Sequence, residues 1–127
     1  MLRYTSCLFA TVPIHAYACG VPSYMTVFAL VTVLSIAFHS TGDDCIGIID
    51  MVVAHAAFIF VMLDSSNAIS TGQPELLLFP VAVFVLWVAE GVFPWQDKYL
   101  HAALHVTAAI GANIYIYCLH SKCTLGM

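Results

Sequence analysis

Three histidines, an aspartate and a serine have the types and the spacing of a metal-dependent site. His101 and His105 are four residues apart, so on a helix both imidazoles lie on one face and can hold the same ion. Ser35 and His39 have the same spacing and share a face of another segment. With His39 as the third nitrogen ligand, a tetrahedral zinc ion keeps one position for water, as catalytic zinc sites do. Asp50 would then orient that water or accept its proton.

Each of these residues also has a structural explanation. Two histidines on one helix face can simply hydrogen-bond to other helices, Ser35 can be a helix-packing serine, and Asp50 can pair with a histidine. His ligation of haem or chlorophyll is a further option, although two histidines on one helix together with an aspartate suit a small ion better than a macrocycle. His55 points about 140° away from Asp50 on an ideal helix and is left out of the site. Glu90 either borders the site or extends to the membrane interface.

The composition predicts that these polar residues lie inside a membrane. Hydrophobic residues make up 62% of the 127 residues and charged residues only 8%, whereas soluble domains carry about 25% charged residues. Charged residues are missing from three long stretches, 4–42, 76–89 and 99–121. The net charge is −4 and there is no basic patch for nucleic acid. We expect an integral membrane protein, but the few cations indicate neither its orientation nor which membrane holds it.

We expect a single all-α domain, a polytopic transmembrane bundle of four or five helices. The four expected spans lie at about 22–39, 45–63, 76–91 and 99–119. A polar loop is expected from Asp64 to about Glu75, and the small residues of 99–119 should let helices approach closely. Residues 1–20 resemble a signal peptide in part, or form an extra short or interfacial helix. Pro13 and Gly20 argue against one long straight helix there.

The order of these spans brings the candidate site together. Successive spans cross the membrane in alternating directions. The end of span 22–39 and the start of span 45–63 therefore lie at one face of the membrane, and the end of span 76–91 and the start of span 99–119 lie at that same face. His39, Asp50, His101 and His105 are therefore all expected just inside that face. In lipid such ionisable residues are costly and usually functional.

The five cysteines have neither CxxC nor zinc-finger spacing. Most are expected to be small apolar residues within the bundle. Cys118 and Cys123 could pair if the C-terminal end faces an oxidising compartment.

The pattern Ser35-Ile-Ala-Phe-His39, then Asp50, then His101-Ala-Ala-Leu-His105 resembles the signature of the CREST superfamily. That group includes alkaline ceramidases, progestin and adiponectin receptors and myomaker-like membrane proteins. The resemblance implies that His39, His101 and His105 are zinc ligands, that Asp50 holds or activates the zinc-bound water, and that Ser35 supplies a nearby hydroxyl. It implies hydrolysis of a lipid amide or ester. Members usually have seven helices; here the interval from Asp50 to His101 has room for one helix where the family has three.

Two functions of different class follow from these patterns. The chain could be a minimal zinc-dependent hydrolase that acts on membrane lipids. It could instead be a non-catalytic accessory subunit of a large respiratory or photosynthetic complex, packed among other membrane protein subunits. In that case the metal site would be structural or vestigial.

Overall fold

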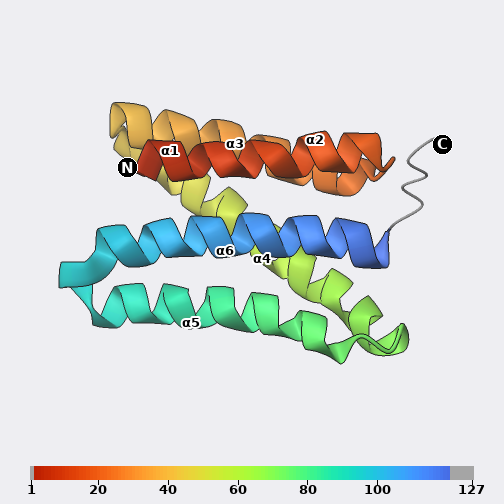
Figure 1. Cartoon of the computed structure of the whole chain (residues 1–127). Coiled ribbons are helices and arrows are strands. Elements are labelled where there is room, and N and C mark those ends of the chain that lie inside the picture. Colours follow the sequence, from red (N-terminus) through yellow and green to blue (C-terminus); the bar gives the residue numbers. More distant parts are fainter. Residues whose placement is uncertain (1, 121–127) are drawn as a thin grey trace.

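The computed structural model describes residues 2–120, apart from the side chain of Asn67, and all regular elements within that range are helical (Figure 1). The prediction of an all-α bundle is therefore confirmed. In chain order the elements are α1 (Leu2–Ser6), η1 (Cys7–Ala10, a 3₁₀ turn), α2 (Thr11–Ala18), α3 (Pro22–Thr41), α4 (Asp44–Ser70), η2 (Pro74–Leu77, 3₁₀), α5 (Leu78–Val92), η3 (Pro94–Gln96, 3₁₀) and α6 (Asp97–Leu119). Four helical segments, Pro22–Thr41, Asp44–Ser70, Pro74–Val92 and Pro94–Leu119, are long and apolar enough to cross a membrane.

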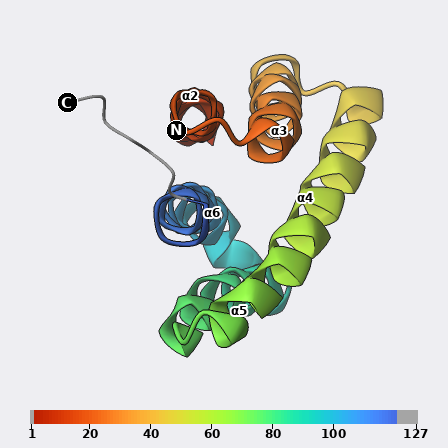
Figure 2. The same ribbon diagram turned by 90° about the vertical axis from the view of Figure 1, so that its right-hand side faces the viewer.

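The N-terminal residues form the additional helical segment that the sequence offered as one option. α1, η1 and α2 follow one path that runs beside α3 and α6 (Figures 1 and 2). Val12 and Ala16 are fully buried in this contact. The 3₁₀ turn has a local cause: Pro13 has no N–H and its ring crowds the preceding turn, so the α-helical hydrogen bonding is interrupted before it.

The polar loop expected from Asp64 to Glu75 is wrong over its first half, because α4 continues to Ser70. Asp64 has partners inside the bundle: its Oδ2 accepts hydrogen bonds from the Tyr24 hydroxyl at 2.6 Å and from His120 Nε2 at 2.7 Å. The hydroxyls of Ser65 and Ser66 donate to carbonyls of the preceding turn. These bonds satisfy polar side chains without ending the helix. The chain turns only around Gly72, whose φ is +75°.

The helices pack unevenly around the bundle. Over the most apolar 18 residues of each membrane-spanning segment, the buried share is 33% in the α6 segment and 28% in α3. It is only 11% in the α5 segment and 6% in α4. Figure 2 shows the reason: α4 begins next to α3 and ends next to α5, so it crosses the bundle obliquely. The oblique crossing separates the start of α4 from the end of α5.

Two glycines permit the closest approaches between helices. A Cβ added at Gly47 of α4 would lie 2.6 Å from the Phe38 ring of α3. A Cβ added at Gly111 of α6 would lie 3.0 Å from Cβ of Phe79 in α5. The second contact agrees with the expectation that small residues of the last helix allow close packing.

Candidate metal centre

The three predicted histidines converge at one end of the bundle. His39 lies in the last turn of α3, and His101 and His105 lie in the first turns of α6. One ring nitrogen from each histidine lies within 4.8 Å of the corresponding nitrogens of the other two. His105 is buried and the other two are half-buried. The three imidazoles together could hold one metal ion.

The other ring nitrogen of His101 is held by α5. Its Nδ1 lies 2.7 Å from Oε1 of Glu90, a carboxylate that can only accept a hydrogen bond when it is ionised. The proton of a neutral His101 therefore sits on Nδ1. This leaves the lone pair on Nε2, which is the form of imidazole that binds a metal.

The same arrangement holds for His105, with hydroxyls in place of the carboxylate. Its Nδ1 lies 3.1 Å from Thr5 Oγ1 and 3.4 Å from Ser6 Oγ. Both hydroxyls donate their single proton to the carbonyl of Leu2, each at 2.9 Å. Their oxygens are thus left to accept from Nδ1–H of His105. The N-terminal helix thereby directs Nε2 of His105 toward the shared space.

Two buried polar atoms of the described residues have no hydrogen-bond partner, and both belong to the predicted site. They are Nε2 of His39 and Oδ1 of Asp50. Buried polar atoms in folded proteins nearly always have a partner. A cation held by the three histidines would satisfy Nε2 of His39. Asp50 lines the same cavity as His101 and His105, so its Oδ1 could accept a hydrogen bond from a water on such an ion. The residues present therefore fit a bound metal ion.

Ser35 joins the histidines indirectly. It is 2% exposed, and its hydroxyl lies 2.9 Å from that of Ser6. Ser6 in turn faces His105, so the chain of contacts runs from α3 through the N-terminal helix to α6. Ser35 also lines the cavity beside the histidines.

The sequence reasoning missed Thr5 and Ser6 and left the role of Glu90 open. If residues 1–20 are taken to span the bundle as a further helix, the alternating directions of successive helices place Thr5 and Ser6 at the same end as the histidines. His55, left out of the site, lies outside the histidine cluster, donates from Nδ1 to Met51 O at 2.7 Å and packs edge-on against Trp87.

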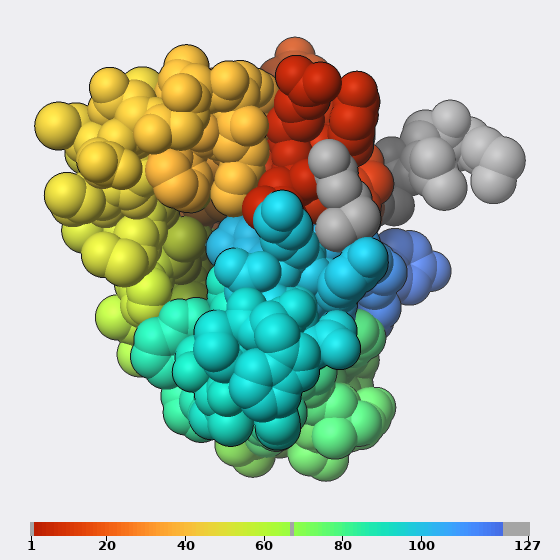
Figure 3. Space-filling view, turned by 90° about the vertical axis from the view of Figure 1, so that its left-hand side faces the viewer, coloured from red at the N-terminus to blue at the C-terminus, as the bar shows by residue number. Residues whose placement is uncertain are grey.

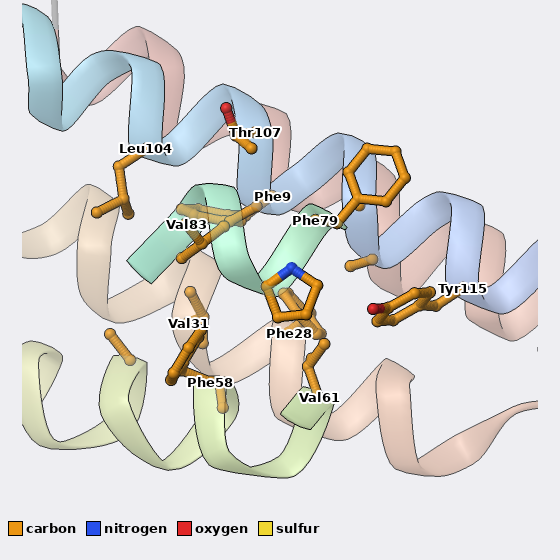
Figure 4. Close-up of a pocket in the computed structure, with 16 residues that line it drawn as sticks. Phe9, Phe28, Val31, Phe58, Val61, Phe79, Val83, Leu104, Thr107 and Tyr115 are labelled. Atoms are coloured by element: carbon orange, nitrogen blue, oxygen red, sulfur yellow. The ribbon is translucent and has the colours of Figure 1, made fainter. Parts of the chain in front are cut away.

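A cavity of about 920 Å³ adjoins the histidines. Its walls come from the starts of α4 and α6 and the ends of α3 and α5, and are mainly apolar. Figure 3 faces this end of the bundle, with the α3–α4 turn and the α5–α6 turn on opposite sides of it. A smaller apolar cavity of about 90 Å³ lies deeper, among side chains such as Phe28, Phe79 and Tyr115 (Figure 4). The two cavities share Phe9, Val31, Ala54 and Leu104 in their walls.

The pairing considered for Cys118 and Cys123 is not formed by Cys118, whose thiol is free. Cys123 lies outside the described residues. The thiols of Cys7 and Cys45 are also free, and both are exposed on the bundle surface.

No protein-family model, curated protein or solved structure matches the chain. The resemblance to the CREST superfamily therefore stays a prediction from five positions. What the protein does must be inferred from the chemistry of the site, because a helical bundle by itself does not specify a function.

Proposed function

We propose that the protein is a zinc-dependent membrane hydrolase that cleaves an amide or ester bond of a lipid. One observation carries the proposal: three histidine nitrogens lie within 4.8 Å of one another. Asp50, whose buried Oδ1 has no hydrogen-bond partner, lines the same cavity as His101 and His105. Three neutral nitrogen ligands with a fourth position left for water are typical of catalytic zinc sites. Imidazole ligands also suit zinc better than they suit magnesium or calcium.

Each side chain has a role that follows from its position. His39, His101 and His105 would hold the ion, which when bound polarises a carbonyl and activates water. Asp50, from the facing wall of the cavity, would accept the proton of the attacking water. Ser35 would present a hydroxyl from α3, on the side of the cavity that carries His39.

The cavity supports a lipid as the substrate. Its volume of about 920 Å³ is within the range of small-molecule sites. The side chains of Phe38, Met51 and Trp87 make its walls apolar, and the deeper cavity of Figure 4 extends the apolar path between the helices. An acyl chain would lie along this path while its carbonyl reached the histidines.

A second candidate function is supported by a different observation. Only 6% of the most apolar 18 residues of α4 are buried, so most of this helix has an outward-facing apolar surface. Other membrane subunits could cover that surface in place of lipid, and the metal site would then be structural. A haem or chlorophyll ligand fits less well: the imidazole centroids are only 4.5–5.4 Å apart, too close for a macrocycle between any two of them.

The test uses the purified full chain in lipid nanodiscs. Elemental analysis should find about one zinc ion per chain, and the protein should release fatty acid from an N-acyl or ester lipid. His101→Ala should remove both metal and activity. A wild-type protein that contains no bound metal would overturn the proposal that this protein is a zinc-dependent hydrolase. The accessory-subunit function would be favoured by two results together: the wild type hydrolyses no lipid, and His101→Ala loses the metal and fails to assemble with partner proteins.

A further inference from the structure

Glu90 lies near the C-terminal end of α5, at the edge of the large cavity. Its side chain is 26% exposed and that of His101 is 29% exposed, so the pair is partly shielded from its surroundings. The bond between them, 2.7 Å from Oε1 to Nδ1, is short for a nitrogen donor and an oxygen acceptor. Such charge-assisted bonds are stronger than bonds between neutral groups.

We propose that Glu90 is a positioning residue that fixes the ring of His101 for metal binding, so that α5 sets the affinity of the metal centre. The inference deepens the proposed function and depends on it, because it requires that the histidines bind a metal. Glu90 would not touch the ion. It would act through His101, by selecting the tautomer and the ring orientation that direct Nε2 toward His39 and His105.

The position of His101 makes such a partner necessary. His105 is 4% exposed and packs edge-on against Phe9, so neighbouring side chains already restrict its ring. His101 is half-buried and faces the cavity between the loosely packed helices. A ring in that setting can rotate unless a hydrogen bond holds it.

The acid closest to His101 in the sequence has a separate explanation. Asp97 lies in the first turn of α6, where a negative charge is favourable because of the helix dipole. Glu90 lies instead in the last turn of α5, where a negative charge is unfavourable. The bond to His101 offsets this unfavourable interaction with the helix dipole. A charge that served only to keep the protein soluble would not need such a bond.

The experiment measures zinc affinity and the visible spectrum of the cobalt-substituted protein, using the full chain in detergent micelles. Glu90→Ala should weaken zinc binding by about 10- to 100-fold, as the loss of such a partner typically does, and should change the cobalt absorption bands. Glu90→Gln has a side chain of the same shape and keeps an oxygen that accepts from Nδ1–H. It should recover most of the lost affinity.

Glu75→Ala is the matched control, because Glu75 is exposed and lies in η2, outside the cavity walls. It should leave affinity and spectrum unchanged. The inference is overturned if Glu90→Ala binds zinc as tightly as wild type with the same cobalt spectrum, if Glu90→Gln binds no better than Glu90→Ala, or if Glu75→Ala weakens binding equally. A wild-type chain that binds no zinc overturns the proposed function as well, so the two failures are distinguishable.

Discussion

The two sides of the histidine cluster are built in opposite ways. On one side, α3, α6 and the N-terminal helix pack closely and bury side chains such as Tyr24, Tyr115 and Ile116 completely. On the other side, α4 and α5 bury few residues and leave a cavity of about 920 Å³ between them and α6. All three histidines lie on the closely packed side. Asp50 and Glu90 come from α4 and α5, which bury few residues although each makes one close contact, at Gly47 and Gly111; we call α4 and α5 the loosely packed side.

This difference separates two requirements of a metal-dependent site. Metal ligands must be held within tenths of an ångström, which closely packed helices provide. In the proposed hydrolase a substrate would also have to reach the metal, which needs helices that part at low cost. In a bilayer, lipid tails are as apolar as the side chains, so helices such as α4 and α5 can stay loosely packed without a hydrophobic penalty.

The largest expected effect is the loss of a ligand from the closely packed side. His39→Ala should reduce zinc affinity by more than about 100-fold, which is the upper end of the effect of removing an indirect partner. His55→Ala, on the loosely packed side, should leave affinity unchanged, because His55 lies outside the cluster. Isothermal titration with zinc measures both. Equal losses in the two variants would contradict a shared three-histidine site.

The next effect tests where α5 is anchored. Gly111→Ala places a methyl group 3.0 Å from Cβ of Phe79, and through overpacking should leave the bundle about 1–3 kcal/mol less stable than Gly91→Ala does. Gly91→Ala adds the same group where no atom lies within 4 Å, and should not destabilise it. Unfolding in a denaturing detergent compares the two. A harmless Gly111→Ala would mean that the α5–α6 contact is as loose as the rest of α5.

A smaller effect tests whether the N-terminal helix belongs to the site. Thr5→Val with Ser6→Ala removes both hydroxyls that face Nδ1 of His105. Zinc affinity should fall by about 10-fold, because the ring loses its hydrogen-bond partner but keeps its packing. Thr41→Val changes an exposed hydroxyl that bonds only to the carbonyl of Ala37 and the backbone N–H of Asp43, and should have no effect. Unchanged affinity in the double variant would show that packing alone orients His105.

The smallest effect lies at the opposite end of the bundle. Tyr24→Phe removes the hydroxyl that donates to Asp64, and should cost about 1 kcal/mol of stability without changing zinc affinity. Tyr117 is 65% exposed, and Tyr117→Phe is the matched control. Thermal unfolding together with zinc titration measures both quantities. A loss of zinc affinity in Tyr24→Phe would mean that the two ends are coupled.

The sequence determined the membrane class, the four long helices and the gathering of His39, Asp50, His101 and His105 at one end. Hydropathy acts along the chain, and the alternating directions of successive spans decide which residues share a membrane face. These features require no knowledge of how the helices tilt.

Tertiary structure alone decided the surroundings of the site. Thr5 meets His105 across 100 residues, and Asp64 meets His120 across 56. Hydropathy suggested a loop at Asp64, but its partners on other helices keep α4 helical to Ser70. The oblique path of α4, which opens the cavity, likewise depends on contacts such as Gly47 against Phe38. Packing between distant segments fixes helix angles and side-chain partners, and local patterns of hydrophobicity do not encode it.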